Sequence, residues 1–518
     1  MKVANRYKWL LPPIFFIGFA ALFHFWSSNI VDLDSFYYIR QSWLLRTNGL
    51  FDVTFPWAQF SVIKLFSASL WYGFAFLLVP FTLIGNLFIG IKIAGVIFTA
   101  AALFSFYWVM NRHQFRWPFL WPLLLFFSVP NVLAQFLMVR PQIVSLALVP
   151  ILFSLLIMGS WPGIAFASFG IAWAHLNFAW LPALIFAVVA TAQFFTYGRS
   201  RWKELVYKGG AILGGLLLGW ALRPNPFGAL RLFYVQVIQQ VFQKQGGLPL
   251  LFGKENLPLK FTALFQNFSP FLILLGGAIF IFWFQMWKHK PVSQDQKIVL
   301  WSSAALAIIF FIFTMLVARR AYNFWAEFGI IFVAAVFSYC ISSNSSHKPI
   351  AQSSATMLAI IFVFMIFYSG SKGVAAIGKD GYKPTELQEA ALWLRDNSQS
   401  GEIVFNLHWP DFSALFFWNQ KNYYISGLDP IFQYEYSPSL YWKFHYLATD
   451  VVTKKTCGAI ACTRDMLEDT YGVLKKDFQA KYVLLTKMEN PAVRQFLEGD
   501  SHFEKKFETN FEAIYLIK

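Results

Sequence analysis

The stretch NIVDLDSFYYIRQSWLLRTNGLFDVTFPW, residues 29–57, sets three carboxylates, Asp32, Asp34 and Asp52, among aromatic side chains and two arginines. The rest of residues 1–370 holds only four acidic side chains, against 25 basic ones over the same range. DSFYYIRQSWLL carries apolar and aromatic residues at helical spacing, so it predicts a helix with Asp34 as its N-cap and Asp32 just before it.

Long apolar runs surround this stretch. The chain is 57% hydrophobic and 20% aromatic, well above an ordinary soluble protein. Runs of about 17–25 apolar residues are long enough to cross a bilayer as helices. They cover residues 8–26, 69–85, 90–110, 117–138, 141–158, 161–178, 179–197, 208–223, 264–286, 298–317, 322–342 and 354–370. The sequence therefore predicts a polytopic α-helical membrane protein with eleven to thirteen transmembrane helices. The helix after Asp34 is expected to lie along the membrane surface.

Basic residues set the expected topology. Lys2, Arg6 and Lys8 precede the first run, which places the N-terminus in the cytoplasm, in the inner membrane of a bacterium. Basic segments are also expected on that side, at residues 198–208, 287–297 and 342–349. Three segments then lie outside, residues 27–68, 224–263 and 371–518. The basic segment NRHQFR, residues 111–116, falls on the wrong side of the membrane when each apolar run is counted as one crossing. One run between residues 69 and 158 is therefore expected to be split or re-entrant. The basic residues form scattered loop clusters rather than one stripe, so nucleic acid is not an expected partner.

Residues 371–518 have the composition of a soluble domain, with 19 acidic and 17 basic residues. Four short strands are predicted, at residues 401–407, 421–426, 480–486 and 512–518. TELQEAALWLRDNS, residues 385–398, predicts a helix with Thr385 as its N-cap. Alternating strands and helices favour an α/β layer. We therefore expect a transmembrane region over residues 1–370 and an extracytoplasmic α/β domain over residues 371–518.

The chain has three cysteines. Cys340 lies in an apolar run and is expected to be a small core residue. Cys457 and Cys462 frame CGAIAC, a spacing that suits a local disulfide in an oxidising compartment. A metal site there is disfavoured, because no second pair of ligands accompanies them.

DLDSFYYIR, followed by NGLFDVTFPW, resembles the first outer loop of GT-C glycosyltransferases, polytopic enzymes that take sugar from a polyprenyl-phosphate lipid. The resemblance is strongest to the catalytic subunit of oligosaccharyltransferases. The loop of that subunit has an Asp, an aromatic pair and an Arg in the order of Asp34, Phe36, Tyr37 and Arg40. It implies that Asp34, with Asp32 beside it, is the base that activates the acceptor, or that the two hold a divalent ion such as Mg or Mn.

Arginines at the ends of apolar runs are candidates for the donor phosphate. Arg140 stands in MVRPQ, and Arg319 and Arg320 stand in VARRAYNFWAEF. An Arg pair beside aromatic residues at the bilayer edge can hold a lipid phosphate through charge-assisted bonds. The alternative is ordinary snorkelling of the side chains to the interface.

Further polar residues are candidates for binding the acceptor or the sugar. His175 is polar within an apolar run, where it is either functional or a hydrogen-bonded packing residue. Glu327 lies shortly after the Arg pair. The full candidate set is Tyr37, Tyr38, Arg40, His175, Glu327, His408, Trp409 and Asp411.

HWPDFS, residues 408–413, faintly resembles the WWDYG signature with which oligosaccharyltransferases recognise the acceptor peptide. Trp409, Asp411 and Phe412 would correspond, but His408 replaces the first Trp and Ser413 replaces the glycine. This departure argues against a peptide acceptor. The alternative is an aromatic core of a strand, a turn and a helix.

The outer loop at residues 224–263 is expected to close over the site, with Gly246 and Gly247 as hinges. The alternative is an amphipathic helix on the surface.

The preferred interpretation is an inverting GT-C glycosyltransferase, transferring a hexose or a pentose from a polyprenyl-phosphate donor to a glycan, lipid or protein acceptor on the outer face. One alternative is metal-dependent en bloc transfer of an oligosaccharide to protein. An alternative of another class is a transporter or flippase of lipid-linked glycans. A transporter needs charges deep within several spans, whereas the charges here cluster at the ends of the apolar runs.

Overall fold

The computed structural model describes residues 10–245, 250–287, 292–341, 348–425, 427–451, 456–457 and 467–518. The chain forms two compact units, each built from separate stretches of sequence. The helical unit comprises Met1–Asp32, Trp71–Arg223 and Lys254–Tyr382. The mixed unit comprises Leu33–Leu70, Pro224–Gly253 and Lys383–Lys518.

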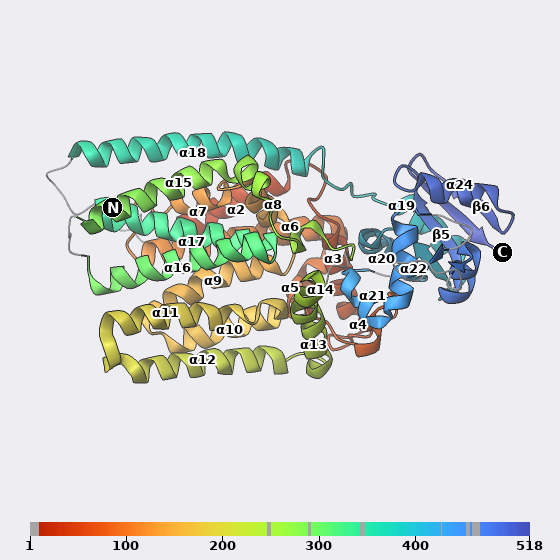
Figure 1. Ribbon diagram of the computed structural model, residues 1–518, viewed down its shortest axis with the longest axis horizontal. Coiled ribbons are helices and arrows are strands. Elements are labelled where there is room, and N and C mark those ends of the chain that lie inside the picture. Colours follow the sequence, from red (N-terminus) through yellow and green to blue (C-terminus); the bar gives the residue numbers. More distant parts are fainter. Residues whose placement is uncertain are drawn as a thin grey trace. The chain divides into compact units, whose positions relative to one another are not determined.

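Each predicted apolar run forms a helix or a helix pair of the helical unit (Figure 1). In chain order these are α2 (Leu11–His24), α5 (Tyr72–Leu78) with η2 (Val79–Leu83), α6 (Leu87–Arg112), α7 (Leu120–Phe126), α8 (Pro130–Leu137), α9 (Gln142–Met158), α10 (Trp161–Ala174) with η3 (Leu176–Phe178), α11 (Leu181–Tyr197), α12 (Trp202–Ala221), α15 (Phe261–Trp287), α16 (Gln294–Leu316), α17 (Tyr322–Ala335) with η8 (Val336–Ile341), and α18 (Lys348–Ile377). Three short helices lie between them, η4 (Gly198–Arg201), η6 (Lys254–Asn256) and η7 (Arg319–Ala321).

The polytopic helical architecture is confirmed. In the part of the chain that the structure describes, six helical segments are long and apolar enough to cross a membrane, and the bent pair α7–α8 would make a seventh. Four further apolar helices are only 10–17 residues long. The count by length is therefore below the predicted eleven to thirteen. Several apolar runs form helices that are short or broken, and α11 and α12 fall within one segment, Leu176–Ala221.

The predicted split run is the one at residues 117–138, where α7 and α8 meet at an angle of 97°. Pro130 is the first residue of α8 and has no N–H to continue a helix from α7. Val129 before it is held in an extended conformation, with φ −147° and ψ 141°, as expected for a residue that precedes proline.

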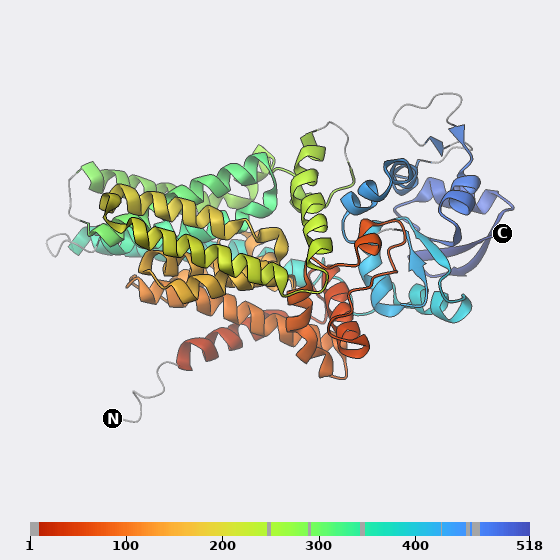
Figure 2. The same cartoon turned by 90° about the horizontal axis from the view of Figure 1, so that it is seen from below.

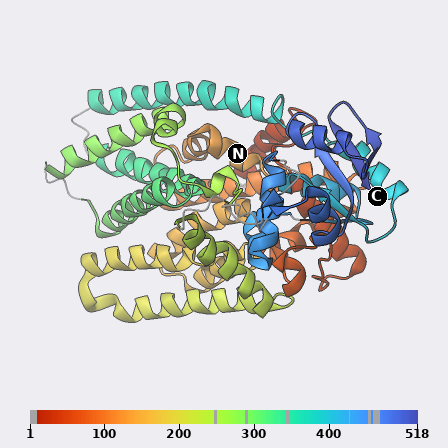
Figure 3. The ribbon, with the colours of Figure 1, turned by 45° about the vertical axis from the view of Figure 1, so that its right-hand side comes forward.

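Small residues allow close packing of α12 on α10 (Figure 2). A Cβ atom added to Gly215 would lie 2.3 Å from the carbonyl oxygen of Ala165, and one added to Gly219 would lie 2.8 Å from that of Phe169. Glycines four residues apart on one helix face are the usual means of such an approach between membrane helices. At the other side of the unit the long helix α18 runs along α15 (Figure 3).

A five-stranded sheet in the order β2-β1-β5-β7-β6 forms the centre of the mixed unit. Its strands are β1 (Ile403–Asn406), β2 (Tyr423–Tyr424), β5 (Ala480–Thr486), β6 (Phe503–Glu508) and β7 (Glu512–Ile517). β1 is parallel to both β2 and β5, whereas β7 is antiparallel to β5 and β6. The four predicted strands are confirmed. β6 was not predicted, because FEKKFE exposes charged side chains along an edge strand.

The remaining elements of the mixed unit are short. They are α3 (Asp34–Asn48), α4 (Val62–Phe66), α13 (Pro226–Phe233), η5 (Tyr234–Gln239), α14 (Gln240–Gln245), α19 (Gln388–Asn397), η9 (Trp409–Asp411), α20 (Phe412–Trp418), α21 (Pro430–Tyr436), α22 (Pro438–Ala448), β3 (Thr456–Cys457), β4 (Leu467–Glu468), α23 (Thr470–Gly472), η11 (Val473–Asp477) and α24 (Pro491–Gly499). The prediction of Thr385 as a helix N-cap is wrong. α19 begins at Gln388 after Leu387, whose φ of 53° marks a turn between Thr385 and the helix.

The first loop is part of the sheet's own layer. Ala58 forms a parallel bridge to Tyr424, and the backbone N–H groups of Gln59 and Phe60 donate to the carbonyls of Tyr424 and Ile425. Residues 58–60 therefore extend the sheet beyond β2. α3 packs against α20. The acid-bearing loop is therefore anchored by both hydrogen bonds and helix packing.

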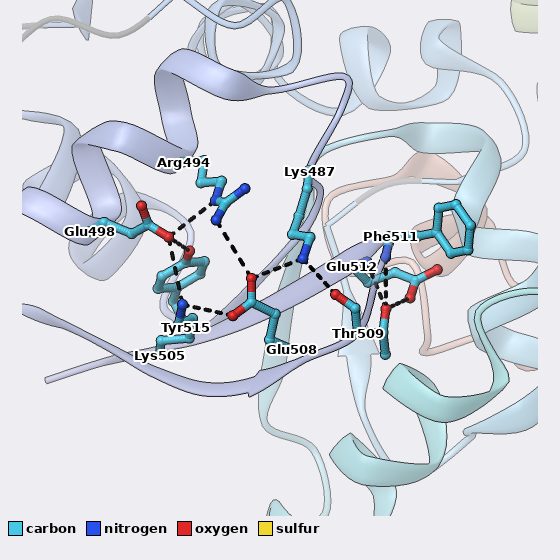
Figure 4. A network of polar contacts seen from close by, with 9 residues as sticks. All are labelled: Lys487, Arg494, Glu498, Lys505, Glu508, Thr509, Phe511, Glu512 and Tyr515. Carbon is cyan, nitrogen blue, oxygen red and sulfur yellow. Dashed lines mark hydrogen bonds and ion pairs between the residues drawn. The ribbon is translucent and has the colours of Figure 1, made fainter.

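Ion pairs cover the far edge of the sheet (Figure 4). Glu508 on β6 accepts from Lys505 at 2.8 Å and from Lys487 at 2.9 Å, and Arg494 of α24 lies 3.6 Å away. These exposed groups lower the pKa of Glu508 to about 2, mainly through the hydrogen bonds from Lys505 and Lys487. A charged edge of this kind disfavours pairing with further strands.

Candidate functional site

Asp34 is the first residue of α3 and not its N-cap as predicted. The N-cap is Leu33, whose backbone is already helical and whose side chain offers no acceptor. The Asp34 carboxylate lies instead in the first turn, where the partial positive charge of the helix N-terminus favours an anion. Asp34 is partly buried, so its carboxylate keeps some access to solvent.

The aromatic residues after Asp34 pack inside the mixed unit. Tyr37 and Tyr38 are 3% and 5% exposed. The Tyr37 ring lies 5.8 Å from the rings of both Phe55 and Phe416. These contacts join α3 to the first loop and to α20, so both tyrosines position the start of α3.

Arg40 lies two turns of α3 beyond Asp34. Its guanidinium lies 5.0 Å from the ring centroid of Trp43 and 4.9 Å from that of Phe417. Burial lowers the pKa of Arg40 to about 10, which still leaves it charged at neutral pH. Arg40 is thus a cation held against aromatic faces on the same helix as Asp34.

Asp32 ends the first stretch of the helical unit and pairs with an arginine there. Arg140, between α8 and α9, donates through Nε to Asp32 Oδ2 at 2.8 Å. Asp32 is 3% exposed, so this charge-assisted hydrogen bond satisfies a carboxylate that has little access to water. The two predicted site residues, 108 positions apart in sequence, are in direct contact.

Glu255 links this pair to the arginines before α17. Its Oε1 lies 3.5 Å from Arg140 Nη1 and 3.8 Å from Arg320 Nη2. Burial raises the pKa of Glu255, but the charges of Arg140 and Arg320 outweigh it and the pKa is lowered overall. Glu255 is therefore an anion between two cations.

Sequence reasoning missed Glu255 as a site residue. The available signal was its isolation, since it is the only acidic residue between Glu204 and Asp295. Backbone hydrogen bonds hold its segment in place, because the N–H of Arg319 donates to Leu257 at 2.8 Å and the N–H of Leu259 donates to Thr314 at 2.9 Å. Only the fold shows that this segment lies beside the Arg pair.

Arg319 and Arg320 form the short helix η7 at the N-terminus of α17. The Nε atom of each is buried and has no hydrogen-bond partner among the described residues. Tyr322, next in the helix, donates to the carbonyl of Asn131 on α8 at 3.3 Å. Two guanidinium groups with unused donors can bind an oxyanion.

His175 and Glu327 lie in the same unit. His175 ends α10 rather than lying inside a span, and its Nδ1 is 3.3 Å from Ser145 Oγ. Glu327 on α17 is 1% exposed, and neither carboxylate oxygen has a partner among the described residues. Both are buried polar groups of the bundle, and both carboxylate oxygens of Glu327 can still accept hydrogen bonds.

The three candidates of HWPDFS belong to the mixed unit. His408 Nε2 lies 2.7 Å from Asn490 Oδ1 and 3.0 Å from Glu489 Oε2. Trp409 packs partly buried against the hydrophobic core of the sheet. Burial raises the pKa of Asp411 to about 8, and the nearby carboxylates of Glu489, Glu386 and Glu512 add to the effect.

The structure groups the predicted site residues by unit. The helical unit brings together Asp32, Arg140 and Arg320, with Arg319 beside them. α3 of the mixed unit carries Asp34, Tyr37, Tyr38 and Arg40, and η9 carries Trp409 and Asp411. The predicted disulfide lies outside the described residues, because Cys462 and the side chain of Cys457 are not described. The predicted hinges Gly246 and Gly247 lie outside them too.

In the described ranges, no group of three or more His, Cys, Asp or Glu side chains could hold a metal ion. Mg²⁺ often takes only one or two carboxylates and completes its shell with substrate phosphate and water. Asp32 and Asp34 have the donor chemistry for such a role, although Asp32 already accepts a bond from Arg140.

No protein-family model matches the sequence, and no curated protein matches it. Solved structures match nearly the whole chain. The oligosaccharyltransferase of Archaeoglobus fulgidus in its apo form matches with a TM-score of 0.57 and 12% identity, over 98% of this chain and 74% of that one. The same enzyme tethered to an acceptor peptide with the NVT sequon matches with a TM-score of 0.52 and 13% identity, over the same shares. The arabinofuranosyltransferase AftD from mycobacteria matches with a TM-score of 0.56 and 13% identity, over 99% of this chain and 41% of that one.

Proposed function

We propose a function from the premise that this chain has the GT-C-type glycosyltransferase fold, which its resemblance to that superfamily predicted and the structural matches confirm. The protein transfers a sugar from a polyprenyl-phosphate donor to an acceptor on the outer face of the membrane, with inversion at the anomeric carbon. The observation that carries this proposal is the cluster of arginines and carboxylates where α8, η6 and η7 meet.

The arginine cluster matches the chemistry of the donor. Arg140, Arg319 and Arg320 outnumber Asp32 and Glu255, which leaves one positive charge uncompensated. A polyprenyl phosphate supplies an anion whose charge grows as it leaves the sugar. Guanidinium groups can bind such a phosphate through two parallel hydrogen bonds. The arginines therefore bind the leaving group and stabilise it in the transition state.

Asp34 acts as the general base in this proposal. The acceptor oxygen attacks the anomeric carbon on the face opposite the phosphate. The bond between that carbon and the phosphate oxygen breaks, and the acceptor proton passes to the Asp34 carboxylate. Asp32, bound to Arg140, orients that arginine and fixes the chain just before α3.

The two matched enzymes are named for different transfers. One of them acts on an acceptor peptide and the other is named for arabinofuranosyl transfer, yet their TM-scores to this chain are 0.57 and 0.56. Transfer of an oligosaccharide to protein with a divalent ion is the second candidate, supported by the oligosaccharyltransferase match. We favour single-sugar transfer, because HWPDFS departs from the WWDYG signature at His408 and Ser413.

Full-length protein in membranes, incubated with polyprenyl-phosphate sugars of several kinds, tests the proposal. Mass spectrometry of the lipid and glycan products is expected to show one sugar transferred by the wild type. Arg320→Ala is expected to reduce donor binding, whereas Arg116→Ala, which changes an exposed arginine in the loop between α6 and α7, serves as the matched control. Addition of EDTA separates the two candidates, since loss of activity restored by Mg or Mn supports metal-dependent transfer. Equal donor binding by Arg320→Ala and the wild type would rule out this arginine cluster as the phosphate site.

A further inference from the structure

A groove of about 650 Å³ lies between α11 and α16 in the helical unit. Its volume is within the range of about 300–1,000 Å³ that is usual for small-molecule sites. None of the site residues described above lines it. Trp301 and Phe195, which line it, are 50% and 82% exposed, so large aromatic faces are uncovered along it.

The groove changes from polar to apolar along its length. On α16, Lys297 is followed at intervals of four residues by Trp301 and Ala305, so the three lie on one helix face. On α11, Thr196 is followed inward by Ala192 and then by Val188. Eight residues of helix span about 12 Å. The groove therefore offers a charged and hydroxyl-bearing end and an apolar end about two helical turns away.

Positive charge is concentrated at the polar end. The Lys297 ammonium forms no ion pair or hydrogen bond with any residue that the structure describes, although the backbone N–H of Lys297 donates to Ser293. Asp295 nearby accepts a hydrogen bond from Tyr197 at 2.5 Å. Arg201 stacks 4.0 Å from the Tyr197 ring. The turn between α11 and α12 also carries Arg199, and the first turn of α12 carries Lys203. Basic groups thus exceed acidic ones around the mouth of the groove.

We propose that this groove binds one anionic phospholipid of the surrounding membrane. The headgroup phosphate pairs with Lys297, beside Thr196, whose hydroxyl donates to the carbonyl of Ala192 at 2.7 Å. One acyl chain runs inward past Trp301 toward Ala305 and Val188. An amphiphile fits both ends of the groove, whereas a free anion would leave the aromatic faces uncovered. Trp and Lys are common anchors at this depth of a bilayer.

Native mass spectrometry of the delipidated full-length protein tests the proposal. Titration with phosphatidylglycerol and, separately, with phosphatidylcholine of the same acyl chains is expected to show one tightly retained phosphatidylglycerol. Lys297→Gln is expected to weaken retention of phosphatidylglycerol about fivefold, the effect of one basic group near an anionic lipid surface. Lys372→Gln, an exposed lysine of α18 outside the groove, is the matched control and should retain the lipid as the wild type does.

A second measurement locates the lipid in the wild-type protein. Phosphatidylglycerol with a diazirine in its acyl chain is expected to label peptides of α11 and α16 in the wild type. Ala192→Trp fills the groove and should abolish that labelling. Labelling spread evenly over the bundle, equal retention of the two lipids, or displacement of the lipid by inorganic phosphate would each overturn the proposal. All of these readouts measure binding, so they stand or fall independently of transferase activity.

Discussion

Asp32 and Asp34 are two residues apart, yet they have different surroundings. Asp32 is buried against Arg140, whereas Asp34 is partly exposed in the first turn of α3. The Asp32 carboxylate already accepts a hydrogen bond from Arg140, whereas the Asp34 carboxylate keeps some access to solvent. The local structure therefore supports Asp34 as the base and Asp32 as the residue that orients Arg140.

Asp34→Asn tests the proposed base. The amide keeps the size of the side chain but cannot take a proton, so turnover is expected to fall at least about a hundredfold. Binding of the polyprenyl-phosphate donor should persist, because the arginines that hold the phosphate are unchanged. Steady-state transfer and donor binding are measured on the same preparation. Turnover near the wild-type rate in a folded Asp34→Asn protein would remove the base from the mechanism.

The Asp32–Arg140 pair is expected to show strong coupling. Removal of Arg140 leaves a buried carboxylate without its charged donor, which costs about 1.5–3 kcal/mol for such a bond. We expect Arg140→Ala to lower the thermal unfolding midpoint more than Asp32→Asn does. The double variant should recover part of the lost stability, because it contains neither an unpaired carboxylate nor an unpaired guanidinium at this contact. Additive effects of the two single variants would contradict the contact.

At the scale of single elements, HWPDFS shows how a sequence motif acquires two roles. Phe412 is fully buried at the start of α20 and packs against Phe55, Phe416 and Tyr424. Trp409, three residues earlier, is only partly buried against the core. Phe412 fixes α20 to the first loop through Phe55, whereas part of the Trp409 side chain remains exposed.

Phe412→Ala and Trp409→Phe separate these roles. Loss of a buried aromatic ring typically costs about 3–5 kcal/mol, so Phe412→Ala should greatly lower the stability of the protein. Trp409→Phe keeps most of the packing and should unfold close to the wild type. If Trp409 contacts the acceptor, as the resemblance implies, its variant should raise the KM for the acceptor and leave that for the donor unchanged. An unchanged acceptor KM would assign Trp409 to the core alone.

The carboxyl group just before α20 gives a pH dependence. The pKa of Asp411 is about 8 in the folded protein, against about 4 in an unfolded chain. Between these values the unfolded chain binds fewer protons at this group than the folded one, so the contribution of Asp411 to stability falls as pH rises from about 4 to 8. The unfolding midpoint of the full-length protein, followed over that range, is expected to decline less steeply in Asp411→Asn. Parallel pH profiles for the two proteins would show that Asp411 titrates normally.

At the scale of the whole molecule, the first loop belongs to the mixed unit rather than to the helices that flank it. Residues 58–60 extend the sheet, and Gln236 of η5 donates to Asp429 at 3.4 Å. We therefore expect both loops and the C-terminal segment to lie on one side of the membrane, and the basic residues predict that this is the outer side.

Cysteine labelling of intact cells tests this topology. In a background without the native cysteines, exposed positions Thr47 and Ser501 of the mixed unit are each replaced by Cys, and so is Ser200 in the turn between α11 and α12. An impermeant maleimide is expected to label Thr47→Cys and Ser501→Cys alike. Ser200→Cys should react only after the membrane is opened. Labelling of one mixed-unit position but not the other would contradict the arrangement.

The sequence by itself determined the helical membrane architecture and four of the sheet strands. Hydrophobic runs and alternating strands are local patterns, and the physics of burial acts on each of them separately. The sequence also indicated that one run between residues 69 and 158 is split, but only the structure shows which one. Pro130 begins α8 at the break after α7, whereas Pro150 and Pro270 lie inside α9 and α15.

Only the tertiary structure decided which charged residues meet. Asp32, Arg140, Glu255 and Arg320 come from four separate segments, and nothing local in GKENLPLK marks Glu255 as the anion between two arginines. The structure also showed that the N-cap of α3 is Leu33 and that Asp34 is the first residue of the helix. An ion pair depends on distances in space, which a sequence does not contain until hydrophobic burial has brought its segments together.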